Sequence, residues 1–296
     1  MTERTVAWRD LLNETVERLG SGGVAGASQE ARWILEDVTG LEGAEWAFGL
    51  DEPATQRGVA RLDELVARRL AGEPIQYVLG HWSFRSLDLV CDRRTLIPRP
   101  ETEQVVEVAL AELDDVLLGR HAGHRAVAVD LGTGTGAIAL SLATERPGTD
   151  VWAVDRSADA LAVARANLAG LGMAGMRVRL AEGSWFAALP DDLAGTLDLV
   201  VTNPPYVAAH EELPESVRAW EPVDALVPGP TGLEAYEELL AEAPRWLAAG
   251  GALVAEIGAA QAGQVTALAE RSGFVDVRVE PDLAGLDRTV VARVPG

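Results

Sequence analysis

From about residue 125 to its end, the chain alternates between short apolar runs and longer stretches with helical spacing, and no other feature constrains the fold as much. Short apolar runs that alternate with helices predict a mostly parallel, doubly wound sheet. The last two runs leave no room for a helix between them, so we expect the final strand to be antiparallel to its neighbour. The predicted strands are Ala126–Leu131, Val151–Asp155, Met176–Leu180, Leu197–Thr202, Ala252–Ile257, Phe274–Val279 and Thr289–Val294, and the helices between them include Ala137–Thr144, Ala158–Leu171, Leu233–Leu247 and Gln261–Arg271.

The N-terminal part of the chain shows helical spacing only. A first helix is predicted near Val6–Leu19, and a second begins with Ser28 as its N-cap and stops at Gly40. A third helix has apolar residues three and four positions apart and ends at Gly72. These helices predict a small helical domain over residues 1–80.

A hairpin and a linker are predicted between this domain and the sheet. Residues 82–90 alternate between apolar and polar side chains, which is typical of paired strands. Pro98 and Pro100 then keep the chain extended, because a residue before a proline is pushed out of the helical region. We therefore expect a β-hairpin linker over residues 81–100 and an α/β domain over residues 101–296.

The charge of the chain excludes several classes of function. There are 46 acidic residues against 25 arginines and no lysine, for a net charge of −21. Such a chain is a poor match for nucleic acid or an anionic membrane, and it lacks the lysine of Schiff-base enzymes and phosphate-binding loops. Cys91 is the only cysteine, and the chain carries no apolar signal sequence or membrane span, so we expect a cytoplasmic monomer without nucleic-acid or membrane partners.

A glycine-rich turn is predicted where the first strand of the sheet ends. Its glycines permit a tight turn and a close approach of the backbone to a ligand. At the end of the second strand, the Asp155 carboxylate can accept hydrogen bonds from ribose hydroxyls. This pattern alone fits a nicotinamide dinucleotide as well as S-adenosyl-L-methionine. The candidate cofactor-binding residues here are Gly132, Thr133, Gly134, Thr135, Gly136 and Asp155.

The segment Asn203-Pro204-Pro205-Tyr206, at the end of the fourth strand, favours S-adenosyl-L-methionine. An enzyme that methylates an amide or an aryl amine must make its nitrogen attack the methyl group. Such a nitrogen is a weak nucleophile because its lone pair is delocalised. Hydrogen bonds from its two N–H groups to the Asn203 side-chain carbonyl and the Pro204 backbone carbonyl would orient the nitrogen and favour a pyramidal, more nucleophilic form. Tyr206 would cover the planar group. We predict Asn203, Pro204 and Tyr206 as catalytic residues, Pro205 as a further substrate contact, and Asn203 also as a cofactor contact.

Together these motifs resemble the HemK/PrmC family, the protein-(glutamine-N5) methyltransferases that modify peptide chain release factors. The Asn-Pro-Pro-Tyr segment is shared with DNA adenine and RNA guanine methyltransferases. The segment Ile-Pro-Arg-Pro-Glu-Thr-Glu behind a helical domain is much more specific. The resemblance covers nearly the whole chain and is carried by Gln76-Tyr77, Gly80–Phe84, Leu96–Glu103, Asp130–Gly136, Asp155, Trp185-Phe186, Asn203–Tyr206, Glu221-Pro222, Gly232-Leu233 and Asp287-Arg288.

The resemblance implies a Rossmann-like, class I S-adenosyl-L-methionine-dependent methyltransferase with a seven-stranded sheet. It implies that the helical domain docks a class 1 release factor and that the glutamine of the factor's Gly-Gly-Gln motif is methylated, with S-adenosyl-L-homocysteine as product. Gly132–Gly136 would wrap the methionine part of the cofactor, Asp155 would bind the ribose, and Trp185 would lie against the adenine. Ser184 stands where family members often have Asp, and its hydroxyl can still accept a hydrogen bond from the adenine amino group.

Two alternatives stay open, an N-methyltransferase for adenine or guanine in nucleic acid and a non-catalytic cofactor-binding module. The acidic charge counts against the first, and the complete Asn-Pro-Pro-Tyr segment counts against the second. The remaining candidates for chemistry have simpler interpretations. We expect no metal site, and we interpret His121 and His124 as solvated loop residues. Glu101 and Glu103 are expected at the start of a helix, and His210 is expected near the substrate entrance.

Overall fold

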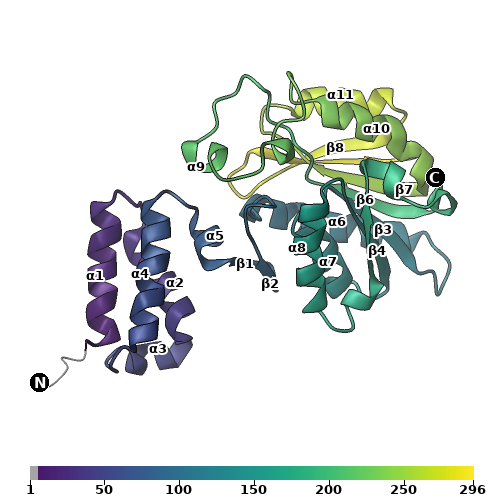
Figure 1. Cartoon of the computed structure of the whole chain (residues 1–296). Coiled ribbons are helices and arrows are strands. Elements are labelled where there is room, and N and C mark those ends of the chain that lie inside the picture. The colour runs from purple at the N-terminus through teal and green to yellow at the C-terminus, as the bar shows by residue number, and fades with distance from the viewer. Residues whose placement is uncertain (1–5) are drawn as a thin grey trace, which may run out of the picture. The chain divides into compact units, whose positions relative to one another are not determined.

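The computed structural model describes residues 6–296, and the chain divides into two compact units at Gly80 and His81 (Figure 1). Within residues 6–296, no helix is long and apolar enough to span a lipid bilayer.

The first unit is a small helical bundle. Side chains from several of its helices fill a common core, among them Leu19, Ile34 and Leu65. Trp8 packs against Gly58, where a Cβ atom would lie only 2.5 Å from the indole ring, so the glycine lets α1 and α4 approach closely. The helices are α1 (Trp8–Ser21), α2 (Ala27–Thr39), α3 (Gly43–Gly49), α4 (Gln56–Leu70) and α5 (Ile75–Leu79).

The predicted helix ends in this unit are partly correct. The prediction of Ser28 as an N-cap is wrong, because α2 begins one residue earlier, after Gly26 in the left-handed region, and has no side-chain cap. Gly40 ends this helix as predicted, with a φ of 69°. Thr55 caps α4 by accepting a hydrogen bond from the Gly58 amide at 3.0 Å, a role that sequence analysis missed.

The second unit is an α/β fold around one large sheet. Within residues 81–296, seven strands lie in the order β5-β4-β3-β6-β7-β9-β8, and a separate hairpin is formed by β1 and β2. The strands are β1 (His81–Phe84), β2 (Leu87–Val90), β3 (Ala126–Leu131), β4 (Thr149–Asp155), β5 (Val178–Glu182), β6 (Leu197–Thr202), β7 (Leu247–Glu256), β8 (Val275–Pro281) and β9 (Asp287–Arg293). The helices are α6 (Pro100–Leu118), α7 (Ala137–Glu145), α8 (Ala158–Ala169), α9 (Glu215–Arg218), α10 (Glu234–Trp246) and α11 (Ala262–Arg271).

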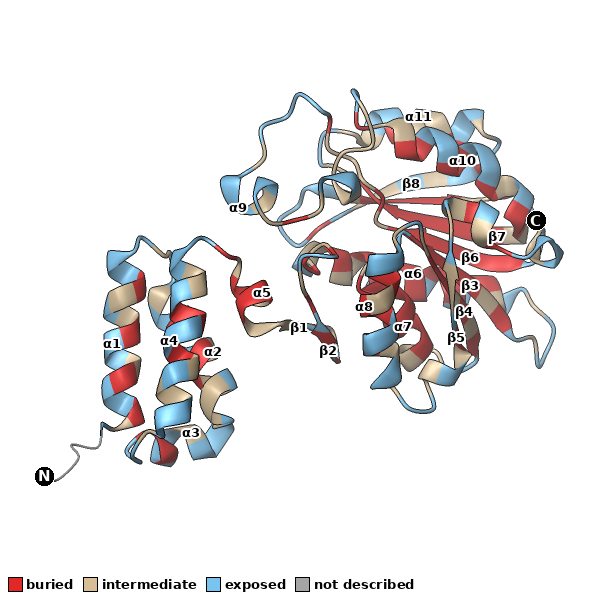
Figure 2. Cartoon of the chain, viewed as in Figure 1, coloured by how far each residue is buried: buried red, intermediate tan, exposed pale blue. Residues whose placement is uncertain are grey.

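Helices cover both faces of this sheet. α6, α7 and α8 pack on one face, and α10 and α11 pack on the other (Figure 1). The central strands are buried over most of their length, as Figure 2 shows, which explains why they read as continuous apolar runs. Each face has its own apolar core, so the prediction of a doubly wound α/β fold is confirmed.

The strand order places two chain segments side by side that are far apart in the sequence. The chain first runs from β3 through β4 to β5 and then returns, so that β6 pairs with the other edge of β3. This is a topological switch point, where doubly wound sheets open a crevice at the carboxyl ends of their strands. Leu131 pairs with Thr202 at this end, and the Thr202 hydroxyl donates to the Leu131 carbonyl at 2.6 Å.

The last strands confirm one prediction and correct another. β9 is antiparallel to both β7 and β8, as expected from the short connection before it. β7 begins at Leu247, five residues before the predicted start at Ala252. A register shift near Leu197 and the small Gly251 let the strand continue, since a Cβ atom at Gly251 would lie 2.9 Å from the Leu197 carbonyl. β5 is also displaced, because a short 3₁₀ turn occupies Gly175–Arg177, where the predicted strand began.

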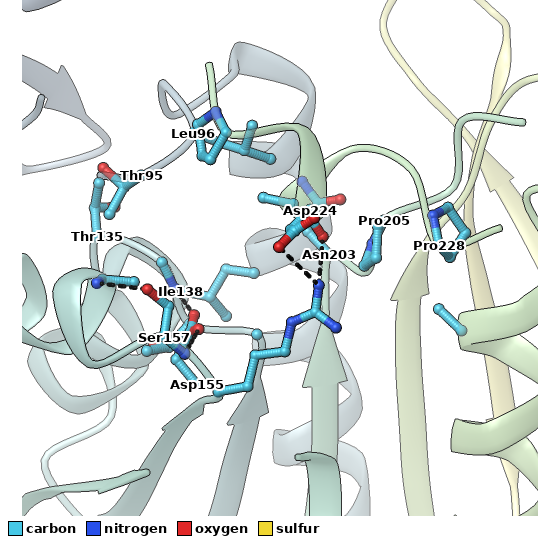
Figure 3. A pocket seen from close by; sticks show the side chains of 18 of the residues that line it. Thr95, Leu96, Thr135, Ile138, Asp155, Ser157, Asn203, Pro205, Asp224 and Pro228 are labelled. Atoms are coloured by element: carbon cyan, nitrogen blue, oxygen red, sulfur yellow. Dashed lines mark hydrogen bonds and ion pairs between the residues drawn. The ribbon is translucent and has the colours of Figure 1, made fainter. Parts of the chain in front are cut away.

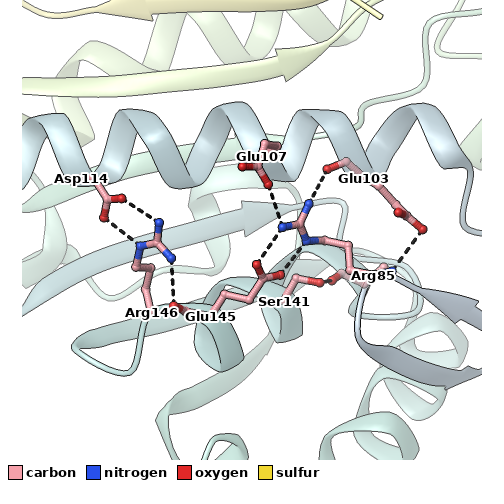
Figure 4. A network of polar contacts seen from close by, with 8 residues as sticks. Arg85, Glu103, Glu107, Asp114, Ser141, Glu145 and Arg146 are labelled. Atoms are coloured by element: carbon pink, nitrogen blue, oxygen red, sulfur yellow. Dashed lines mark hydrogen bonds and ion pairs between the residues drawn. The ribbon is translucent and has the colours of Figure 1, made fainter. Parts of the chain in front are cut away.

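The hairpin is held against α6 and α7 by one arginine at its turn (Figure 4). Arg85 adopts a φ of 52°, and its guanidinium donates to both carboxylate oxygens of Glu145 at 2.5 and 2.7 Å. The same group donates to the Glu103 carbonyl and to the Glu107 carboxylate. The Arg85 side chain is 18% exposed, so these contacts are only partly screened by water.

We expect Arg85→Met to destabilise the second unit. Loss of hydrogen bonds to a half-buried charge should lower its free energy of unfolding by about 1–3 kcal/mol in urea titrations. The Arg85 guanidinium holds the pKa of the Glu145 carboxyl below its ordinary value of 4.5. This stabilisation is therefore fully present above pH 4.5 and is lost as the pH falls through the lowered pKa, so the variant should lose less stability on acidification than the wild type.

Arg125→Met is the matched control, because Arg125 makes an equally well-aligned pair with Asp150 in an exposed position. It should leave the urea transition nearly unchanged. Equal effects of the two substitutions would contradict the anchoring role of Arg85.

We also expect Cys91 to be unreactive in the folded protein. The thiol is fully buried, and burial raises its pKa to about 12. At pH 8 the reactive thiolate should be depleted by about three orders of magnitude relative to an exposed thiol. A thiol reagent should therefore modify the protein rapidly only after denaturation in guanidinium, and rapid modification of the native protein would contradict the buried position.

Candidate active site

A cavity of about 740 Å³ opens at the carboxyl ends of β3, β4 and β6 (Figure 3). Segments from before α6, from the turns after these strands and from the start of α10 contribute to its wall. Of the predicted site residues, the wall contains Gly132, Thr133, Gly134, Thr135, Asp155, Ser184, Trp185, Asn203 and Pro205. Gly136, Pro204 and Tyr206 do not line it.

The glycine turn after β3 has the backbone conformation that only glycine adopts without strain. Gly132, Gly134 and Gly136 have φ values of 76°, 56° and 86°. Asp155 holds the turn in place, because one of its carboxylate oxygens accepts from the Gly134 amide at 2.9 Å. Its other oxygen accepts from the Ser157 amide at 2.9 Å, which fixes the Asp155 side chain. Asp155, which is predicted to bind the ribose, thus also shapes the turn.

A second carboxylate lies beneath this turn. Asp130 is fully buried, and burial raises its pKa to about 7. Its Oδ2 accepts hydrogen bonds from the Thr133 hydroxyl and the Ala139 amide, whereas its Oδ1 has no partner among the described residues. Asp130 does not line the cavity, so it supports the turn from below.

The wall opposite the glycine turn contains Trp185. Its φ of 44° is unusual for an aromatic residue, and its indole N–H donates to Glu238 at 2.8 Å. The Trp185 ring lies close to the turn, since a Cβ atom on Gly132 would be in van der Waals contact with it at 3.7 Å. Ser184 lies next to Trp185 on the wall. Glu238 also lines the cavity and was missed by sequence analysis, because it stands on α10 without a recognisable motif.

Asn203 lies at the end of β6 and faces the cavity (Figure 3). Its side-chain Nδ2 donates to the Thr102 hydroxyl at 3.1 Å. Tyr206 instead reaches away from the cavity wall, and its hydroxyl donates to Glu256 at 3.3 Å. Burial raises the pKa of this phenol well above its usual range. The predicted contact of Tyr206 with a planar substrate group therefore stays a prediction.

The segment Leu96–Arg99 forms the cavity wall before α6. It is fixed by Glu221, whose buried carboxylate pairs with Arg99 and accepts from the Ile97 amide at 3.1 Å. Both segments are recognisable as motifs in the sequence, but they are more than a hundred positions apart, so no local pattern pairs them.

The other residues considered for chemistry lie elsewhere. The interpretation of His124 as a solvated loop residue is wrong, because its Nε2 lies 2.8 Å from the buried Asp198 carboxylate. His210 is exposed and does not line the cavity. Glu101 and Glu103 lie in the first turn of α6, as predicted.

Comparisons with known proteins agree with these features. The sequence matches the PrmC N-terminal domain over residues 10–80 and the methyltransferase small domain over residues 112–220. A release factor glutamine methyltransferase from Cereibacter sphaeroides is 42% identical, over 97% of this chain and 98% of the relative. A protein of the same name from Geobacter sulfurreducens is 39% identical, over 99% of this chain and 100% of the relative.

A solved methyltransferase from Pyrococcus furiosus has a similar fold, with a TM-score of 0.51 and 18% identity over 78% of this chain and 98% of that chain. The fold, the two matching domains and the near full-length identity to curated relatives lead to one conclusion. The chain belongs to the release factor glutamine methyltransferase family.

Proposed function

We propose that this protein transfers a methyl group from S-adenosyl-L-methionine to the side-chain amide nitrogen (N5) of the glutamine in the Gly-Gly-Gln motif of class 1 peptide chain release factors. The observation that carries this proposal is the position of Asn203 on the wall of a cavity that also contains the glycine turn and Asp155. The names of the curated relatives support the choice of a release-factor glutamine over a nucleic-acid base.

The cavity residues fit S-adenosyl-L-methionine. A volume of about 740 Å³ is within the usual range of small-molecule sites. Gly132–Gly136 would hold the methionine part, because the positive φ values of the glycines form a tight turn on the cavity wall. Asp155 would accept from the ribose hydroxyls, and Trp185, with Ser184 beside it, would contact the adenine.

The protein's own contribution to the reaction is orientation and polarisation of the glutamine amide. S-adenosyl-L-methionine supplies a methyl group on a sulfonium, which is an excellent leaving group. The Asn203 Oδ1 would accept one amide N–H and the Pro204 carbonyl the other, which draws the nitrogen out of conjugation and holds it for in-line attack. The surplus proton can leave to water after the new bond forms, so this chain needs no strong general base.

The proposal also includes the protein partner, the cellular location and the oligomeric state. The helical unit would dock the release factor, and the net charge of −21 suits a basic protein surface better than nucleic acid. We propose a cytoplasmic monomer that contacts neither nucleic acid nor membrane.

Labelled S-adenosyl-L-methionine tests the substrate directly. The full chain is incubated with purified release factor, tRNA, rRNA or DNA, and the labelled molecule is identified. Label should appear on the release factor and should be absent when its Gly-Gly-Gln glutamine is replaced by alanine. Label on nucleic acid would support the base-methyltransferase alternative instead, and no label on any of them would support a cofactor-binding module.

We expect Asn203→Ala to abolish most of the turnover. Removal of one acceptor that orients the reacting group should reduce kcat by about 10²–10³-fold. The affinity for S-adenosyl-L-methionine, measured by calorimetry, should change little, because the glycine turn and Asp155 remain in place. Turnover near the wild-type rate would refute the assigned role of Asn203.

We expect Asp155→Ala to weaken cofactor binding. The substitution removes the ribose acceptor and the hydrogen bond that holds the turn at Gly134, so the Kd for S-adenosyl-L-methionine should rise by about 10–100-fold. Asp150→Ala is the matched control, because it lies near the opposite end of the same strand and pairs with the exposed Arg125. Equal loss of affinity in both variants would contradict a specific role for Asp155.

A further inference from the structure

The proposed function requires Asn203 to present its side-chain oxygen, and not its NH₂ group, to the glutamine amide. The two ends of an asparagine amide have almost the same shape, so shape alone does not select between them. If the proposed function holds, as we assume here, a neighbouring group must select the productive orientation of Asn203.

Thr102 and Glu256 form a buried hydrogen-bonded chain behind Asn203. Thr102 lies in the first turn of α6 and is 5% exposed, and Glu256 ends β7 and is 1% exposed. The Thr102 hydroxyl donates to the Glu256 carboxylate at 2.6 Å. The other carboxylate oxygen accepts from the Tyr206 hydroxyl at 3.3 Å.

The direction of these hydrogen bonds determines the orientation of Asn203. Two hydroxyl groups converge on the two oxygens of Glu256, the Thr102 hydroxyl donating to Oε2 and the Tyr206 hydroxyl to Oε1. Burial raises the pKa of this carboxyl above its ordinary value, and a proton on Oε1 would still leave Oε2 as the acceptor for Thr102. The Thr102 hydroxyl has a single proton and uses it toward Glu256, so toward Asn203 it can act only as an acceptor. Asn203 must therefore turn its NH₂ toward Thr102, where the Nδ2–Oγ1 distance is 3.1 Å.

We propose that Thr102 and Glu256 are positioning residues that hold the Asn203 amide with its Oδ1 available to the substrate. Neither residue needs to touch the reacting atoms. Thr102 lies on the cavity wall, but its hydroxyl proton is donated to Glu256 and not to a ligand. A rotated Asn203 would present donors to a nitrogen whose N–H groups are themselves donors, and the nitrogen would lose its acceptor.

Thr102→Val tests this role, because valine keeps the shape of threonine and removes the hydroxyl. We expect kcat for release-factor methylation to fall by at least about tenfold with the Kd for S-adenosyl-L-methionine unchanged. Thr102→Ser restores the hydroxyl and should recover most of the kcat. Thr149→Val is the matched control, because Thr149 is equally buried, its hydroxyl has no partner among the described residues, and it starts β4 at the end of the sheet away from the cavity.

A second readout is independent of the substrate. The chain contains three asparagines, at positions 13, 167 and 203, so selective ¹⁵N-asparagine labelling gives three side-chain NH₂ signal pairs. The pair that disappears in Asn203→Ala identifies Asn203. In Thr102→Val this pair should shift and exchange faster with water, whereas Thr102→Ser should resemble the wild type and Thr149→Val should leave it unchanged.

The two readouts separate the possible failures. If the wild type does not methylate release factor, the proposed function fails, while the NH₂ signals still decide whether Thr102 orients Asn203. An unchanged Asn203 signal in Thr102→Val would overturn the inference. A loss of kcat that Thr102→Ser does not restore, or that Thr149→Val reproduces, would also overturn it, because a purely structural role would then account for the loss.

Discussion

The pairing of β3 with β6 is the constraint on which the cavity depends. Leu131 and Thr202 are neighbours across the two strands, so the glycine turn and Asn203, which follow them, emerge side by side. The Thr202 hydroxyl ties the two strands together at this point through the Leu131 carbonyl. A shift of one residue would exchange the two faces of β6, disrupt the apolar core on each face and displace Asn203 from the glycine turn. The apolar packing on both faces of β6 therefore also maintains the geometry of the site.

The parts of the site that follow a strand end could be predicted from the sequence, and the parts that join distant segments could not. The glycine turn is recognisable because positive φ values strongly favour glycine. Asp155 and Asn203 are recognisable because the carboxyl ends of parallel strands meet at one edge. The contact of Thr102 with Glu256 spans 154 positions and depends on how α6 packs on β7, which no local pattern encodes.

The same distinction explains why the predictions for Ser28, for His124 and for the start of β7 are wrong. Ser28 is a good N-cap residue by type, yet Gly26 ends the preceding turn in the left-handed region and the helix starts before Ser28. His124 lies in a glycine-containing loop, and only the fold brings it to the buried Asp198. The start of β7 depended on a backbone irregularity near Gly251 that hydrophobic periodicity does not reveal.

The absence of lysine has a structural consequence that composition alone does not suggest. Arg85 joins a hairpin to two helices by donating to three separate residues, and Arg68 pairs with Glu73 while it donates to the carbonyls at the end of α5. The planar guanidinium has five donors in fixed directions, whereas a lysine ammonium could not align with so many acceptors at once. Many arginines make such internal contacts, and with 46 acidic residues against 25 arginines the excess of carboxylates leaves a strongly acidic molecule. A surface of this kind repels phosphate backbones, so the charge that composition reports and the arginine pairs that the fold contains both favour a protein substrate.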